Sequence, residues 1–268
     1  MLRLNKFIYR KLYYFFNLKP NSKYSILTNS LKRNGFAILN KHDINCNHVL
    51  KECDSIIKED NEGNIRLKNI TNKDYIKTLI NKDDLSKYPN IVKFALNKDL
   101  LSIVSSYLGH IPCLCYINIW KSPVSIKSEY KASGSQLWHI DHESFRQIKV
   151  FLYLNDVKEK SGPMEIFNRN YTKNQQLKLK YRLGEGKKHF SKGLDSKYSE
   201  KLIGNRGQII FADTSSCFHR GSNKVQKARY ILALQFLPVN AFSSNKFNQY
   251  RFLQEKGLVN SFTPLLHY

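Results

Sequence analysis

The alternation of hydrophobic and polar residues divides the chain into a helical first half and a strand-rich second half. Apolar residues recur every three or four positions over 46–60 and again over 92–107, which predicts two amphipathic helices. Gly109 follows the second helix and is typical of a helix end. Likewise, Gly35 separates a helix end at 29–34 from a short strand, GFAIL. The first half is therefore expected to be mostly helical.

The pattern changes after Pro112, where short segments of strand-like composition follow one another. Turn signals separate them, notably Ser161-Gly162-Pro163 and the glycines of 204–207. Six segments have this character: 113–120 (CLCYINIW), 135–141 (SQLWHID), 148–157 (IKVFLYLNDV), 164–167 (MEIF), 207–213 (GQIIFAD) and 228–236 (ARYILALQF). We expect an α+β protein with a β-core over 112–240 and helices, mostly from the N-terminal half, packed outside it.

Neither a repeat nor a linker divides the 268 residues, so we expect a single domain over 1–268. Residues 1–25 are basic and aromatic and predict a helix. This helix either packs on its own domain or makes peripheral contact with an anionic membrane surface. Residues 171–202 form a Lys-rich insertion between strand-like segments. The insertion is either a substrate lid or a plain surface loop.

Composition adds a strongly basic charge to this picture. The chain carries 44 Lys and Arg against 21 Asp and Glu, a formal net charge of +23. Such a charge attracts phosphates, carboxylates, nucleic acid or an acidic membrane. Because the basic residues are spread along the chain, biased base composition of the genome explains them equally well. The five cysteines, an odd number in a long chain, form no disulfide framework, and a reduced cytoplasmic location is the economical inference.

Three residues of the second half could share one metal ion. His139 and Asp141 are two apart in the segment 135–141, so both side chains point to the same face of a strand. His219 follows the segment 207–213 after a short loop. Two histidines and one carboxylate are the facial set that holds Fe(II) while leaving other positions open. A His-x-Asp pair alone is also typical of an exposed surface, so this interpretation depends on His219 lying close by.

Arg229 begins the last strand-like segment and could bind a carboxylate. Strand alternation places it on one face with Ile231, Ala233 and Gln235. The other face carries Tyr230, Leu232, Leu234 and Phe236. A planar guanidinium holds a carboxylate through two parallel hydrogen bonds. Alternatively, Arg229 is a solvated residue at a strand end.

The order and spacing of several motifs resemble the phytanoyl-CoA dioxygenase family of Fe(II)/2-oxoglutarate-dependent oxygenases. The motifs are RNGFAIL, SSYLGHIP, QLWHIDH, VFLYLNDV with SGP, GQIIFADTSSCFHRG and the Arg-led last strand. The resemblance implies a double-stranded β-helix (jelly roll, cupin-like), iron at His139, Asp141 and His219, and 2-oxoglutarate at Arg229. It also implies conversion of 2-oxoglutarate and O2 to succinate and CO2. Asp141 is retained, whereas halogenating relatives replace this carboxylate, which favours hydroxylation.

In this fold, residues near Tyr116 and Asn118 often contact the co-substrate, and the alternative for both is an ordinary strand role. Further candidates for the substrate pocket are Trp138, His142, Arg146 and Phe151. The family's Gly-Ser-His after the Gly-Pro turn is replaced by Asn168-Arg169-Asn170. This departure argues against carrying over the family's substrate specificity.

Two classes of function remain open at the level of sequence. The first is an oxygenase that hydroxylates a small-molecule or carrier-linked substrate, for which the basic charge suggests an anionic group. The second is a catalytically silent jelly-roll module that binds an anionic partner or a membrane surface. A nucleic-acid-modifying oxygenase is suggested by charge alone. Since no nucleic-acid-binding motif accompanies that charge, no nucleic acid partner is expected.

Overall fold

The computed structural model describes residues 22–39, 42–64, 75–110, 112–125, 132–181, 189–190 and 193–238. The helix expected over 1–25 lies outside the described residues up to position 21, as do parts of the Lys-rich insertion. Within the described ranges, none of the helices combines the length and the apolar character that crossing a membrane requires.

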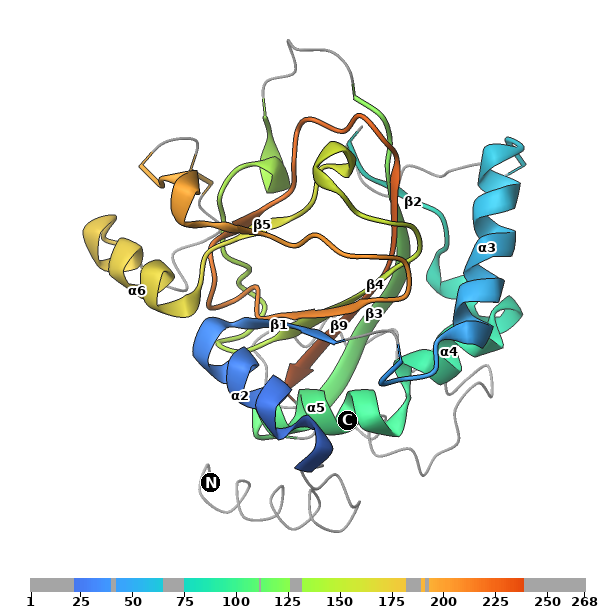
Figure 1. Cartoon of the computed structure of the whole chain (residues 1–268), viewed down its shortest axis with the longest axis horizontal. Coiled ribbons are helices and arrows are strands. Elements are labelled where there is room, and N and C mark those ends of the chain that lie inside the picture. Colours follow the sequence, from blue (N-terminus) through green and yellow to red (C-terminus); the bar gives the residue numbers. More distant parts are fainter. Residues whose placement is uncertain are drawn as a thin grey trace.

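Two antiparallel sheets form the body of the protein (Figure 1). The main sheet has the strand order β1-β7-β4-β9-β3-β2. Its strands are β1 (Phe36–Leu39), β2 (Lys77–Thr78), β3 (Pro112–Ser122), β4 (Ile148–Tyr153), β7 (Ile209–Ala212) and β9 (Arg229–Pro238). The minor sheet has the order β6-β5-β8 and consists of β5 (Glu165–Ile166), β6 (Glu200–Lys201) and β8 (His219–Arg220).

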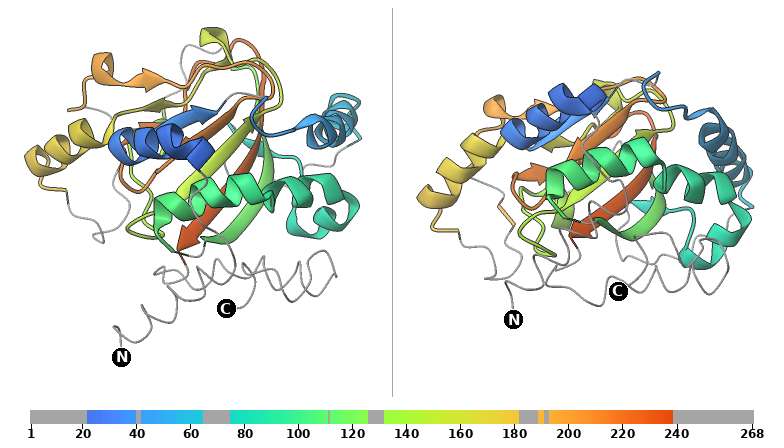
Figure 2. Two further views of the ribbon diagram at one scale, coloured as in Figure 1. Left: turned by 60° about the horizontal axis from the view of Figure 1, so that its bottom comes forward. Right: turned by 90° about the horizontal axis from the view of Figure 1, so that it is seen from below.

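Helices cover the outside of the main sheet. Figure 2 shows α2 and α5 running across its outer face, with α3 and α4 beside them and α6 at the opposite edge. Their bounds are α2 (Ser25–Asn34), α3 (Asn47–Asn61), α4 (Pro89–Ala95), α5 (Lys98–Leu108) and α6 (Arg169–Lys178). Short 3-10 helices occupy Ser22–Tyr24, Lys82–Lys87, Gly134–Gln136, Glu159–Ser161 and Ser196–Tyr198. The expected arrangement, helices from the first half outside a β-core, is therefore confirmed.

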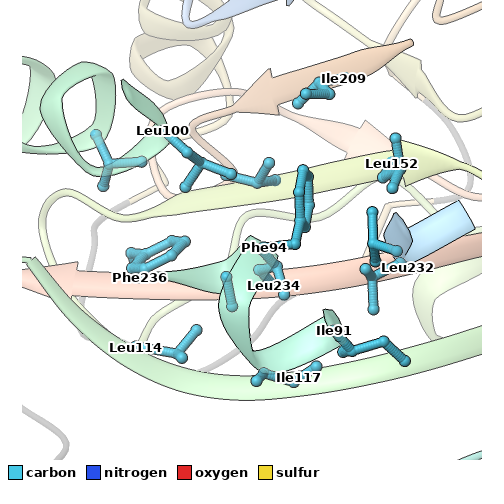
Figure 3. Packing of buried hydrophobic residues seen from close by; sticks show 14 of the residues in the cluster. Ile91, Phe94, Leu100, Leu114, Ile117, Leu152, Ile209, Leu232, Leu234 and Phe236 are labelled. Atoms are coloured by element: carbon cyan, nitrogen blue, oxygen red, sulfur yellow. The ribbon is translucent and has the colours of Figure 1, made fainter. Parts of the chain in front are cut away.

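The largest hydrophobic core lies between helices α2 to α5 and the main sheet (Figure 3). β9 shows how the sequence divides the two faces of the sheet. Its residues Tyr230, Leu232, Leu234 and Phe236 belong to this core. Arg229, Ile231 and Gln235 instead line a cavity on the inner face. The alternation expected for β9 is confirmed, and it places the polar residues Arg229 and Gln235 on the face that is turned away from the helices.

Two sequence expectations differ from the structure. The single helix expected over 92–107 is two helices, because the side chain of Asn97 accepts hydrogen bonds from the backbone N–H groups of Asp99 and Leu100 and starts α5. The segment 135–141 is not a continuous strand. It begins with a 3-10 turn and pairs through isolated bridges, Trp138 with Phe190 and His139 with His219.

Gly35 joins α2 to β1 where no side chain has room. Its φ of 88° is left-handed, and a Cβ atom there would lie 2.2 Å from the Sγ atom of Cys217. Gly35→Ala should therefore lower the free energy of unfolding by about 2–4 kcal/mol, as the sum of backbone strain and overpacking. Gly109 is a matched control, since it ends α5 at φ 69° with nothing within 4 Å.

Gly109→Ala should cost only the strain, about 1–2 kcal/mol. Urea unfolding of both variants measures the difference. Equal losses at the two glycines would contradict the close approach of Gly35 to Cys217.

Candidate active site

His139, Asp141 and His219 meet inside the protein, although 78 residues (219 − 141) separate the last two. One ligand atom from each lies within 4.8 Å of the other two, and all three side chains are buried. The Nε2 atom of His139 is 3.8 Å from Asp141 Oδ1, and that of His219 is 3.6 Å from Asp141 Oδ2. Three ligand atoms this close together can share one metal ion.

Backbone pairing brings the two histidines together. The N–H of His139 donates to the carbonyl of His219 at 3.1 Å, and the reverse bond measures 3.0 Å. This bridge extends the edge of the minor sheet at β8. The N–H of Asp141 donates to the carbonyl of Thr214 at 2.8 Å and fixes the third group. Isolated backbone bridges and one bond to a loop thus orient the three side chains, where a regular strand was expected from the sequence.

The hydrogen bonds of the imidazole rings suit a metal centre. The Nδ1 atom of His139 lies 2.8 Å from the carbonyl of Leu137, and the Nδ1 atom of His219 lies 3.0 Å from the carbonyl of Cys217. A carbonyl only accepts, so each Nδ1 carries the proton and donates it. In a neutral ring with this tautomer, the lone pair lies on the Nε2 atom that faces Asp141, as it does in metal-binding histidines.

The loop before His219 is held by Asp213. Its Oδ1 atom accepts from Ser215 N, Ser215 Oγ and Ser216 N, which closes a turn. Its Oδ2 atom accepts from Tyr107 of α5 and Arg169 of α6. Asp213 therefore fixes the loop through a turn and through bonds to two helices. None of these bonds joins its carboxylate to His219.

Lys149 of β4 is a further member of the site that the sequence analysis did not identify. Its Nζ atom donates to Asp141 Oδ2 at 2.5 Å, and both side chains are largely buried. Burial alone would lower the pKa of Lys149, but its interactions with Asp141, Tyr116 and Glu143 together outweigh burial and raise the pKa. Strand alternation provided the missing signal, because Lys149 shares a face of β4 with Phe151 and Tyr153, which also line the cavity.

Replacing Lys149 should show how strongly the buried carboxylate of Asp141 depends on its ammonium group. Lys149→Met leaves the Asp141 carboxylate buried without its cation, so the free energy of unfolding of the metal-free protein should fall by about 3 kcal/mol. Added Mn(II) should recover much of the loss, since the metal charge replaces the ammonium. Thermal unfolding with and without Mn(II) measures both effects.

Lys201→Met is the matched control, because Lys201 pairs with Glu159 at 2.7 Å on the exposed surface. Its loss should be below about 1 kcal/mol and independent of Mn(II). The account of Lys149 fails if the two lysine variants behave alike.

Arg229 is buried at the start of β9 without a carboxylate partner among the described residues. Its guanidinium donates to the carbonyl of Gly162 at 2.6 Å and to Ser122 Oγ at 3.1 Å. Its Nε atom has no hydrogen-bond partner in the described part of the chain. Burial lowers the pKa of Arg229. A buried cation with a donor to spare fits an anionic ligand, and the alternative of a solvated strand end is wrong.

A cavity of about 270 Å³ connects these groups. His139, Asp141, His219 and Arg229 all line it, as does Tyr116 of β3. Asn118 lies between Tyr116 and Trp120 on the same strand and is not among the side chains that line the cavity. The structure thus brings five of the six predicted site residues to one cavity.

The four further pocket candidates are distributed differently, and all of them lie in the described ranges. Phe151 lines the cavity. Trp138 is instead buried in a separate aromatic cluster, with the Arg220 guanidinium 4.4 Å above its ring. His142 contacts Tyr181 through a 2.5 Å bond from its Nε2 atom, and Arg146 is exposed.

No family model matches the chain, and no curated protein matches it by sequence. Solved structures do match. The epimerase SnoN, described in complex with Fe3+, alpha ketoglutarate and nogalamycin RO, aligns at TM-score 0.56 and 11% identity, covering 82% of this chain and 85% of SnoN. HygX from Streptomyces hygroscopicus, with nickel and 2-oxoglutarate bound, gives TM-score 0.53 and 12% identity, covering 81% and 87%.

EctD from S. alaskensis gives TM-score 0.58 and 12% identity, covering 86% of this chain and 82% of EctD. At such low identities these likenesses show the fold. The double-stranded β-helix expected from the sequence is therefore confirmed.

Proposed function

We propose that this chain is an Fe(II)/2-oxoglutarate-dependent dioxygenase that hydroxylates a small-molecule or carrier-linked substrate. 2-Oxoglutarate and O2 are converted to succinate and CO2 in the same reaction. The observation that carries the proposal is the shared cavity, where three buried ligand atoms within 4.8 Å of one another face the same space as the buried cation Arg229.

The donor set fits Fe(II). Two neutral imidazoles and one carboxylate are the set typical of non-haem iron oxygenases, and they leave positions open for an oxo acid and oxygen. Iron bound there supplies the oxidative decarboxylation of 2-oxoglutarate coupled to oxidation of the second substrate.

The protein's own groups hold and orient the reactants. Arg229, supported by Ser122, binds the far carboxylate of 2-oxoglutarate through its guanidinium and so points the oxo-acid end toward the histidines. Lys149 donates to one oxygen of Asp141 and holds the carboxylate beside the two histidines. Tyr116 and Asn118 stay predictions as co-substrate contacts.

Relatives in fold support the proposal. SnoN was solved in complex with Fe3+ and alpha ketoglutarate, and HygX with nickel and 2-oxoglutarate. SnoN is described with nogalamycin RO, and a second HygX structure contains hygromycin B, so small-molecule substrates are the expectation here. Membership of the phytanoyl-CoA dioxygenase family is part of the proposal and depends on the sequence motifs.

An anaerobic titration tests the proposed function. Fe(II) and 2-oxoglutarate added together should give a weak visible charge-transfer band, and neither should give it alone. The band should be absent in Asp141→Ala and present in His48→Ala, in which an exposed histidine distant in sequence is replaced. Failure of the wild-type protein to form the band would favour the catalytically silent binding module.

A further inference from the structure

The cavity floor has two polar ends. Arg229 pairs across the main sheet with Ser122 of β3 at one end. Six residues further along β9 (235 − 229), Gln235 pairs with Tyr116 of β3 and Lys149 of β4. At ~3.3 Å per residue, about 20 Å of strand separates these backbone positions. A single five-carbon co-substrate anchored at Arg229 therefore leaves the Gln235 end to another molecule.

The two ends differ in charge. Arg229 is a cation without an acidic partner in the described ranges, whereas the ammonium of Lys149 is neutralised by Asp141 at 2.5 Å. Four side chains with a formal charge line the cavity, and the negative charges of Asp141 and Glu143 cancel the positive charges of Lys149 and Arg229. Fe(II) and the 2-oxoglutarate dianion also balance each other. A neutral second substrate keeps the buried space neutral, and an anionic one leaves a net charge that is costly to bury.

Two polar atoms at the Gln235 end have no partner among the described residues. These are the phenol oxygen of Tyr116 and the Oε1 atom of Gln235, both buried. The amide nitrogen of Gln235 is already used, since it donates to Gln147 Oε1 at 2.7 Å. Burial raises the pKa of Tyr116, so its phenol keeps the proton that it can donate.

These atoms select the chemistry of a ligand group. The phenol of Tyr116 donates, and the amide oxygen of Gln235 accepts. A carboxylate cannot donate to Gln235, and an ammonium cannot accept from Tyr116. A hydroxyl group does both. Beside them, the rings of Trp120 and Phe151 lie 6.2 Å apart and offer an apolar wall.

We propose that the second substrate is a neutral, hydroxylated small molecule, one hydroxyl of which binds between Tyr116 and Gln235 while its apolar surface lies against Trp120 and Phe151. This inference rests on the proposed function and narrows its substrate class. It also gives Tyr116 a role different from the contact with 2-oxoglutarate predicted from the sequence, and the tests below decide between the two roles.

The first test is a binding comparison on anaerobic protein loaded with Fe(II) and 2-oxoglutarate. The probes are methyl glucoside, which is neutral, and methyl glucuronide, which differs by one carboxylate. Methyl glucoside should perturb the charge-transfer band, and its Kd should rise at least about tenfold in Tyr116→Phe, because Gln235 alone then holds the hydroxyl. Methyl glucuronide should bind at least about tenfold more weakly than the glucoside.

Three results would overturn the inference: equal or tighter binding of the glucuronide, glucoside binding that is unchanged in Tyr116→Phe, or no binding of either probe. A wild-type protein that forms no charge-transfer band refutes the proposed function itself. A normal band followed by any of the three results refutes only the substrate class.

The second test needs no ligand. Because the Tyr116 hydroxyl has no partner among the described residues, Tyr116→Phe should leave Tm unchanged or raise it by about 2–4 °C, with the affinity for 2-oxoglutarate unaltered. Tyr107→Phe is the matched control, since the Tyr107 hydroxyl donates to Asp213 and accepts from Arg169, and its Tm should fall. A fall in Tm for Tyr116→Phe as large as that of the control, or a weaker affinity for 2-oxoglutarate, would contradict the role assigned to Tyr116.

Discussion

Asp141→Ala is expected to remove iron binding almost completely. The substitution deletes one of three ligands and leaves the Lys149 ammonium buried without its carboxylate. We expect the affinity for Fe(II) to fall by at least about 100-fold, beyond the loss typical of residues that only support a ligand. Anaerobic competition with a chromophoric chelator measures the affinity, and succinate formation should fall in parallel.

A lost affinity could also arise from unfolding, so a second variant separates the two causes. Asp141→Ala combined with Lys149→Met removes both charges of the buried pair and should be more stable than Asp141→Ala alone. It should still fail to bind iron. Asp195→Ala, which replaces an exposed aspartate paired with Lys197, should bind iron normally. Normal iron affinity in Asp141→Ala would refute the metal centre.

Arg229→Met is expected to weaken 2-oxoglutarate binding by about 100-fold, since it removes a buried charge partner of a carboxylate. Iron affinity should change by less than about threefold, because Arg229 contacts Gly162 and Ser122 and none of the three ligands. The KM for 2-oxoglutarate and the Kd for Fe(II), measured on the same preparation, show whether the two effects separate.

Arg206→Met provides the control for loss of an arginine. Arg206 bonds to Leu154 O and to the partly exposed Asp54, away from the cavity lining. Arg206→Met should leave the KM for 2-oxoglutarate and the Kd for Fe(II) unchanged. Parallel loss of iron and 2-oxoglutarate binding in Arg229→Met would mean that Arg229 supports the fold and does not bind the co-substrate.

Local patterns in the sequence are sufficient to predict those elements whose two faces differ in polarity. Residues of β9 alternate between the large core and the inner face, and this alternation by itself predicts that Arg229 and Gln235 share one face. The spacing of His139 and Asp141 also predicts a shared face. Both side chains do line the cavity although their segment is not a strand, because bridges to His219 and a bond to Thr214 impose the same orientation.

Other features depend on contacts that periodicity does not encode. The helical pattern of 92–107 runs unbroken through Asn97, yet its side chain caps α5 and divides the helix. Asn168-Arg169-Asn170 departs from the motif of the family that the sequence resembles. In the structure Asn168 caps α6 and Arg169 reaches Asp213, so the segment fixes the loop before His219. Lys149 could have been found from strand alternation, but its pairing with Asp141 depends on the tertiary fold.

A crystal structure of the protein grown anaerobically with Fe(II) and 2-oxoglutarate tests the central claim most directly. Anomalous scattering at the iron edge should give one strong peak within bonding distance of His139, Asp141 and His219, with the far carboxylate of 2-oxoglutarate on the Arg229 guanidinium. Iron bound elsewhere, or a co-substrate whose carboxylate avoids Arg229, would contradict the account.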